Sequence, residues 1–193
     1  MHESVIRTTT KLAMTIVGKY VQKGDIAVDA TAGNGHDTLA LLRLVGESGK
    51  VYAFDVQRQA IERTKKLLTE SAPFLLARVS LVCDSHESLS AYVEEKGRVS
   101  AVVFNLGYLP SGDKSINTAA ESTVSAIGES LKTLKKGGIV SIVMYPGTDK
   151  GKTERDAVFS YVQTFPVQNY HVCRCDMPNS PGVSPEILWI ETK

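Results

Sequence analysis

The chain has few cysteines and no apolar run long enough to cross a membrane. Its three cysteines, Cys83, Cys173 and Cys175, are too few for a disulfide framework and suit a reducing compartment. No CxxC or HxxxH pair is present, so we expect no metal site. Without an apolar run, we expect neither a signal peptide nor a membrane-spanning helix. Together these absences predict a cytoplasmic protein without membrane contact.

The chain also lacks an excess of either charge. Its 193 residues carry a formal net charge of +1, which argues against binding to nucleic acid or membranes through overall charge. Any RNA partner must therefore be held by a local basic patch. The candidates for that patch, several of which could equally be solvated surface residues, are Lys114, Lys132, Lys135, Lys136, Lys150, Lys152 and Arg155.

Repeats, low-complexity tracts and linker-like segments are missing as well, which predicts a single domain over residues 1–193. Short apolar runs predict strands near residues 26–30, 51–55, 79–84, 100–105, 139–145, 167–175 and 186–191. Helical patterns lie between most of these runs, near residues 5–20, 36–44, 60–68, 124–136 and 152–164.

This alternation predicts an α/β protein with a Rossmann-like, mostly parallel seven-stranded sheet and helices on both faces. No helix separates the last two strands, so we expect an antiparallel hairpin at one edge. We expect Lys135 and Lys136 in the last turn of the helix near 124–136, with Gly137-Gly138 ending it. Cys173 and Cys175 lie two residues apart on a strand and are expected to be buried on one face.

Polar residues end four of the predicted strands. Asp29, Asp55, Asp84 and Asn105 each follow an apolar run. In a doubly wound sheet, ligands bind beyond the carboxyl ends of the strands. Simple strand terminators or helix caps are the alternative, but four such residues favour a binding site.

The first strand leads into a glycine-containing turn, which runs from Asp29 to Thr38 with the sequence DATAGNGHDT. Gly33 and Gly35 allow positive φ and a close approach of ligand to backbone, and the helix that follows offers free N–H groups. Asp55 lies 20 residues after Gly35, near the spacing of an acid that binds ribose hydroxyls. Both NAD and S-adenosylmethionine fit this pattern.

Two features favour S-adenosylmethionine over NAD. A carboxylate at Asp29, at the mouth of the turn, would repel a pyrophosphate but attract the ammonium and sulfonium of S-adenosylmethionine. Thr38 also stands where the dinucleotide fingerprint has its third glycine. The predicted cofactor is therefore S-adenosylmethionine, with S-adenosylhomocysteine as its product.

At these residues the chain resembles the class I methyltransferases, and more closely the YtqB/MnmM-like family, long labelled rRNA methylases and understood as tRNA wobble-uridine methyltransferases. The resemblance spans nearly the whole chain. Its specific part is the block Asn105-Leu106-Gly107-Tyr108-Leu109-Pro110 with Asp113-Lys114. The other matching segments are Asp29–Thr38, Phe54–Gln57, Asp84–Glu87, Glu121–Thr123, Tyr145–Gly147 and Asn179–Pro181.

The resemblance implies the class I methyltransferase fold and methylation of the exocyclic amine of 5-aminomethyl-(2-thio)uridine in the anticodon region of tRNA. The predicted cofactor-binding residues are Asp29, Thr31, Gly33, Asn34, Gly35, Asp37, Thr38, Asp55, Val56, Gln57, Asp84, Ser85, His86 and Asn105. Methylation of rRNA, a small molecule or a protein is the alternative, and an NAD-dependent oxidoreductase is the weaker one. His86 could flank the adenine or could be a surface or capping residue.

The expected catalytic residues are Asn105, Leu106 and Tyr108. The Asn105 amide oxygen and the Leu106 carbonyl can accept N–H groups of the amine and direct its lone pair, and Tyr108 can stack on a flipped-out base. Substrate-binding residues are predicted to be Tyr108, Lys114, Tyr145 and Lys150. Relatives often carry His where this chain has Thr148, so no role of that histidine is carried over. A homodimer would extend the RNA-binding surface.

Overall fold

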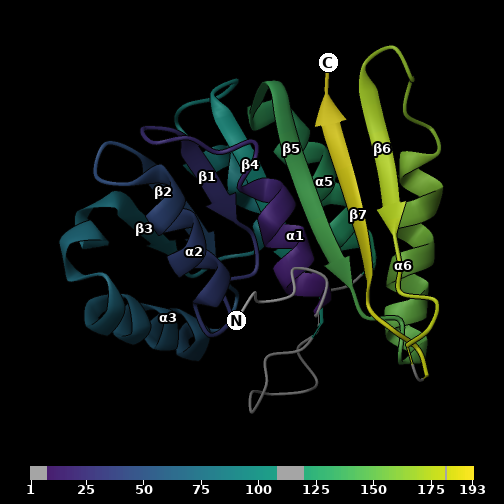
Figure 1. Ribbon diagram of the computed structural model, residues 1–193, viewed down its shortest axis with the longest axis horizontal. Coiled ribbons are helices and arrows are strands. Elements are labelled where there is room, and N and C mark those ends of the chain that lie inside the picture. Colours follow the sequence, from purple (N-terminus) through teal and green to yellow (C-terminus); the bar gives the residue numbers. More distant parts are fainter. Residues whose placement is uncertain (1–7, 108–119, 181) are drawn as a thin grey trace.

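The computed structural model describes residues 8–107, 120–180 and 182–193. Its seven strands form one sheet in the order β3-β2-β1-β4-β5-β7-β6 (Figure 1). The strands are β1 (Ile26–Asp29), β2 (Lys50–Phe54), β3 (Val79–Val82), β4 (Val99–Asn105), β5 (Leu134–Met144), β6 (Tyr170–Cys175) and β7 (Glu186–Thr192). β7 alone runs antiparallel to its neighbours β5 and β6. The predicted mostly parallel sheet with an antiparallel hairpin at one edge is confirmed.

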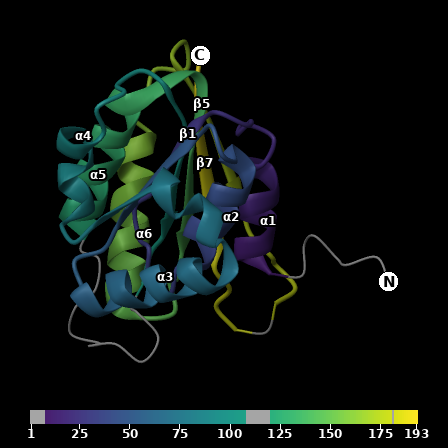
Figure 2. The same cartoon turned by 90° about the vertical axis from the view of Figure 1, so that its left-hand side faces the viewer.

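Helices cover both faces of the sheet (Figure 2). One face carries α1 (Thr9–Val17), α2 (His36–Val45) and α3 (Arg58–Ser71), and the other carries α4 (Leu89–Tyr92), α5 (Ala120–Thr133) and α6 (Asp149–Val162). Among the described residues, the connections include the short 3-10 helices η2 (Pro73–Arg78) and η3 (His86–Ser88). The sequence did not predict α4, η2 or η3, because each is too short to show a helical period.

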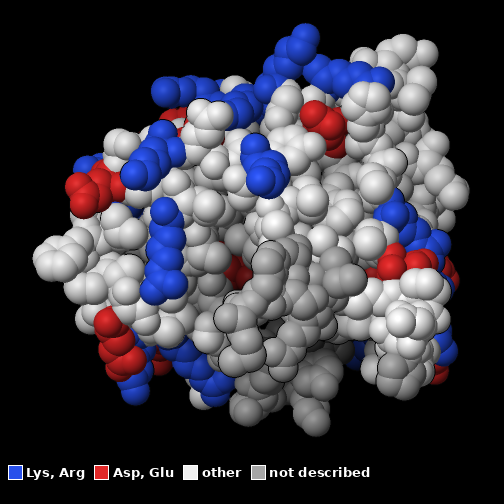
Figure 3. Space-filling view, viewed as in Figure 1, with Lys and Arg blue, Asp and Glu red and all other residues white. Residues whose placement is uncertain are grey.

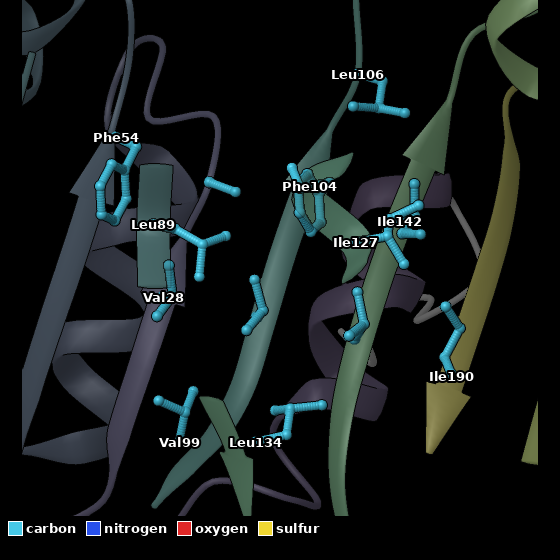
Figure 4. Packing of buried hydrophobic residues seen from close by; sticks show 14 of the residues in the cluster. Val28, Phe54, Leu89, Val99, Phe104, Leu106, Ile127, Leu134, Ile142 and Ile190 are labelled. Carbon is cyan, nitrogen blue, oxygen red and sulfur yellow. The ribbon is translucent and has the colours of Figure 1, made fainter. Parts of the chain in front are cut away.

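Alternate residues of each central strand enter the two halves of the core. On β4, Val102 and Phe104 pack towards α5 and α6, whereas Ala101 and Val103 pack towards α1 and α2. Figure 4 shows the first of these clusters, with Phe104 beside the helix residue Ile127. Burial on both faces explains why the central strands read as continuous apolar runs. The packed sheet holds its strand ends in place as a rigid frame for the loops beyond them.

The boundary between α5 and β5 differs from the prediction. The helix ends at Thr133, and Lys135, Lys136, Gly137 and Gly138 belong to β5. The register of β5 on β4 shifts across this segment, and Gly137 has a φ of +71°. The Thr192 hydroxyl donates to the carbonyl of Lys135 at 2.8 Å and accepts from the amide of Gly138 at 3.1 Å. Bonds to β7 therefore hold the segment in the sheet.

The expectation of two buried cysteines on β6 is wrong. Cys173 is exposed and Cys175 is partly exposed, because β6 is the edge strand and most of its residues face solvent. In the part of the chain that the structure describes, no helix is both long and apolar enough to span a membrane.

Candidate functional site

The carboxyl ends of the parallel strands meet at one edge of the sheet, the lower edge in Figure 1. The chain leaves β1 and β4 towards opposite faces, so the two strands form the switch point at which doubly wound sheets bind ligands. A hydrogen bond joins the two strand ends, since the backbone N–H of Asn105 donates to Thr31 Oγ1 at 2.7 Å. The predicted site thus has a defined centre between β1 and β4.

The glycine-containing turn after β1 packs tightly on α3. Gly33 and Gly35 have φ values of +54° and +86°. A Cβ added at Gly35 would lie 2.9 Å from the Cα of Thr64, so no larger residue fits without moving α3. The Thr64 hydroxyl also donates to the carbonyl of Gly33 at 3.3 Å. Thr64 was missed by the sequence interpretation, because nothing in its own helix marks it as a partner of the turn.

Asp29 lies inside the turn, although the sequence predicted a position at the mouth of the turn. Its side chain is fully buried and accepts hydrogen bonds from the Thr38 hydroxyl at 2.5 Å and the Thr31 amide at 3.1 Å. Burial, together with the neighbouring charge of Asp37, raises the pKa of Asp29 to about 7. The expectation of an open carboxylate is wrong; Asp29 holds the turn together through its bonds to Thr38 and Thr31.

Asp55 connects the loops that follow β1 and β2. Its Oδ2 accepts from the Gly33 amide at 3.0 Å, and its Oδ1 accepts from the Gln57 amide at 2.8 Å. An ionised carboxylate has about four acceptor positions, so two remain for the hydroxyls of a ribose. Beside it, Val56 exposes 55% of its surface and offers an apolar contact to a ring.

Asp84 and His86, which follow β3, have different environments. Asp84 accepts from the Tyr92 hydroxyl at 2.8 Å and the Ser85 amide at 2.7 Å, and the bond from Tyr92 lowers its pKa. His86 is 8% exposed, with Nδ1 3.3 Å from the Ala30 carbonyl and its ring edge-on to Phe104. Burial lowers the pKa of His86 and favours its neutral form. The surface alternative for His86 is therefore excluded.

A third group of polar side chains meets on the β4 and β5 side of the switch point. The side-chain Nδ2 of Asn105 donates to Asp37 Oδ2 at 3.4 Å. The Asn105 side chain also hydrogen-bonds the Tyr145 hydroxyl. Burial raises the pKa of Asp37, and burial together with the charge of Asp37 raises the pKa of Tyr145. A Cβ added at Gly107, whose φ is +149°, would lie 3.6 Å from the Tyr145 ring. Three elements thus bring these groups together.

Other predicted residues line or support this edge. Leu106 is buried, and its amide donates to the Val143 carbonyl at 2.8 Å, which fixes the chain just after β4. Asn34 Oδ1 accepts a hydrogen bond from Arg63 at 3.5 Å. Lys150 is exposed in the first turn of α6, and Thr148 caps that helix by accepting from the Gly151 amide at 3.1 Å.

Two predicted residues, Tyr108 and Lys114, lie outside the described residues. Tyr92, which holds Asp84, was missed by the sequence interpretation; its one signal is an aromatic residue eight positions after that acid.

Known proteins resemble the chain in sequence. Residues 51–191 match the model of a family described as "Putative rRNA methylase". A chloroplastic tRNA (mnm(5)s(2)U34)-methyltransferase of Arabidopsis thaliana is 39% identical over 181 residues. That alignment covers 91% of this chain and 66% of the plant protein, so the chain spans just under two thirds of its relative.

Solved structures share the fold over the full length. A protein of Clostridium thermocellum described as a "putative rRNA-methylase" superposes with a TM-score of 0.93 at 38% identity, covering 98% of this chain and 100% of that one. A protein of Streptococcus mutans described as "a putative methyltransferase", in complex with SAH, superposes with a TM-score of 0.85 at 34% identity, covering both chains completely. The predicted class I methyltransferase fold is confirmed.

Proposed function

The chain belongs to the rRNA methylase family, and on that premise we propose that it transfers a methyl group from S-adenosylmethionine to the amine of 5-aminomethyl-(2-thio)uridine at the wobble position of tRNA. The observation that carries the proposal is the joined pair of strand ends at β1 and β4. There the hydrogen bond between Thr31 and Asn105 holds the glycine-containing turn, which we assign to the cofactor, next to the side chains of Asn105 and Asp37, which we assign to the amine. The name of the plant relative supports this substrate, and the S. mutans complex with SAH supports the cofactor.

The residues at the carboxyl edge fit S-adenosylmethionine. Asp55 keeps acceptor positions for the ribose hydroxyls, and the turn through Gly33 and Gly35 lets a ligand approach the backbone. Asp84 and Val56 flank the same loops and would face the adenine. The remaining residues that we propose for the cofactor site, some of them as supports of the turn, are Asp29, Thr31, Asn34, Thr38, Gln57, Ser85, His86 and Asn105.

The protein's part in the reaction is to position the amine. When bound, S-adenosylmethionine supplies a methyl group on a positively charged sulfur, which keeps the electrons of the broken C–S bond. The Asn105 side chain and the Leu106 carbonyl would accept N–H groups of the amine and direct its lone pair towards the methyl. Orientation of this kind can supply on the order of 7–11 kcal/mol of barrier lowering. Tyr108, Lys114, Tyr145 and Lys150 are proposed to bind the RNA.

The test is methyl transfer from labelled S-adenosylmethionine to tRNA from cells that lack the enzyme and accumulate the aminomethyl form. Label should appear at the wobble nucleoside, and fully modified tRNA is the control. Label in rRNA, in a protein or in small amines, with none in tRNA, would replace this substrate by another. Calorimetry with S-adenosylhomocysteine and with NAD distinguishes a methyltransferase on any of these substrates from an oxidoreductase, since binding of NAD alone would refute a methyltransferase.

A cytoplasmic location, a single domain and a homodimer remain predictions. The plant relative is named as chloroplastic, so members of one family work in more than one compartment if the cytoplasmic prediction holds. Light scattering of the purified chain would give its oligomeric state. A dimer would bring two basic surfaces to one tRNA, which is the reason for expecting it.

A further inference from the structure

We propose that Asp37 receives the amine of the substrate: its carboxylate pairs with the ammonium form and removes one proton before methyl transfer. This inference rests on the proposed function, because it requires a substrate that carries an aliphatic amine. It also moves Asp37 from the cofactor site, where the sequence had placed it, to the substrate site. The assignment is argued from the position of the side chain, from its neighbours and from the chemistry of amines.

The position of Asp37 favours the substrate side of the switch point. Asp37 belongs to the first turn of α2, after the cofactor turn, yet its side chain reaches across to Asn105 at the end of β4. Tyr145, just beyond the end of β5, is the other polar neighbour on this side. Asp55, the residue suited to the ribose, follows β2 on the opposite side of β1. Asp37 therefore faces the strands beyond which an acceptor would bind.

The titratable neighbours of Asp37 leave it as the group that carries the negative charge. Asp29 from β1 and Tyr145 from the loop after β5 face it, and His36 lies next to it in α2; these are its titratable neighbours among the residues that the structure describes. Two close carboxylates resist being ionised together, and Asp29 is the more deeply buried. Asp29 therefore keeps its proton to higher pH, and Asp37 is the member of the pair that ionises first.

The chemistry requires such an acceptor. An aliphatic amine is mostly protonated at neutral pH, since the reference pKa of a lysine amine is about 10.4, and the protonated form has no lone pair for attack. In the proposed step one N–H bond of the ammonium breaks and an O–H bond forms on Asp37, which leaves a neutral amine and a neutral carboxylic acid. Burial raises the pKa of Asp37, and a carboxylate with a raised pKa is a better proton acceptor at neutral pH.

The other groups of the described site are poorer acceptors. Asn105 cannot take a proton, and the raised pKa of Tyr145 keeps its hydroxyl protonated at neutral pH. Burial lowers the pKa of His86, so its ring holds an added proton poorly, and its Nδ1 is already paired with the Ala30 carbonyl. Asp84 lies beyond β3 with a lowered pKa. Asp37 combines burial, a position on the substrate side and a hydrogen bond to Asn105.

The variant Asp37→Asn tests the proposal, with Asp156→Asn on the exposed side of α6 as a control of equal charge change. We expect calorimetry to show S-adenosylhomocysteine binding within about threefold of wild type. We expect single-turnover methyl transfer near neutral pH to fall about 100-fold, as removal of a general base does. The deficit should shrink as pH rises towards the pKa of the free amine, because the amine then arrives neutral. A deficit under threefold, a deficit equal at every pH, or lost cofactor binding would overturn the proposal.

Binding supplies a readout that is independent of turnover. An anticodon stem-loop carrying 5-aminomethyluridine should bind the wild type more tightly than one carrying uridine, and Asp37→Asn should lose that preference. A preference that survives the substitution overturns the proposal. If Asp37→Asn does not fold, the wild-type rate decides, because a rate that stays flat between about pH 5.5 and 8 also overturns it. An inactive wild type would instead contradict the proposed function.

Discussion

At the scale of single residues, Asp29 makes the stability of the protein depend on pH. Its pKa is about 7 in the folded protein against a reference of 3.8. Between these values the folded chain binds more protons than the unfolded chain, so the contribution of Asp29 to the free energy of unfolding falls as pH rises through this window. The neighbouring Asp37 shifts in the same direction. The loss from Asp29 amounts to at most about 4 kcal/mol by pH 7.

Asp29→Asn should remove most of that fall. Urea unfolding at several pH values between about 4 and 8 would measure it, as the difference in slope between variant and wild type. The exposed Asp156→Asn should leave the slope unchanged. If Asp29→Asn and Asp156→Asn both showed the wild-type slope of stability against pH, the pKa of Asp29 would not be raised in the folded protein.

The residue scale is also where the sequence was least complete. Strand ends could be recognised from apolar runs, so Asp55 and Asn105 were identified as site residues. The inward direction of Asp29 could not be, because it depends on Thr38 in the next helix folding back over the strand. Thr64 and Tyr92 come from segments with no motif, and only the packing of α3 and α4 brings them to the site.

At the scale of elements, the contact between the cofactor turn and α3 depends on one missing side chain. Gly35→Ala has two costs: a positive φ, worth about 1–2 kcal/mol, and a Cβ placed 2.9 Å from the Thr64 backbone. Gly137→Ala is the matched control, because its φ is +71° but nothing lies within 4 Å of the added Cβ. We expect Gly35→Ala to lose about 1–3 kcal/mol more stability than Gly137→Ala, the typical cost of overpacking.

The same pair separates stability from binding. Gly35→Ala should weaken the binding of S-adenosylhomocysteine, because α2 and α3 must move apart, whereas Gly137→Ala should bind it as wild type does. Thermal unfolding and calorimetry measure the two effects. Equal losses of stability in the two variants would show that α3 yields at little cost.

The boundary of a helix or strand could be predicted where its hydrophobic pattern ended in a clear turn. It could not be predicted where the same residues suit both a helix end and a strand start. The start of α2 at His36 follows from the glycines before it. The start of β5 did not, because the lysines after Thr133 suit a helix end equally well. Only pairing with β4 and β7 decides it, and that pairing joins residues far apart in the sequence.

At the scale of the whole molecule, alternating strands and helices were enough to predict the layers and the parallel sheet. The position of β7 between β5 and β6 was not predicted beyond an edge hairpin, since strand order depends on packing across the sheet. The overall charge was uninformative because 22 Lys and Arg residues are nearly balanced by 21 Asp and Glu residues. Figure 3 shows Lys and Arg side chains gathered along the uppermost edge, opposite the candidate site.

The two edges make different predictions for RNA binding. Lys150 and Lys152 are exposed at the start of α6, at the carboxyl edge where the proposed reaction takes place. Arg78 and Arg98, with Lys50, line a cavity of about 400 Å³ at the opposite edge. If the wobble base of an RNA enters the proposed site, we expect its phosphates to pass over Lys150 and Lys152. Each phosphate contact contributes about 0.7–0.9 to the slope of log K against log salt concentration.

The double variant Lys150→Ala/Lys152→Ala should therefore weaken binding of an anticodon stem-loop and reduce that slope by about 1–2. Arg78→Ala/Arg98→Ala removes the same charge from the other edge and should change neither quantity. Fluorescence anisotropy over a range of salt concentrations measures both. A larger loss from the arginine pair would mean that the RNA crosses the amino edge as well. A monomer could then bind it only by wrapping it around the sheet, whereas a dimer could offer one edge from each subunit.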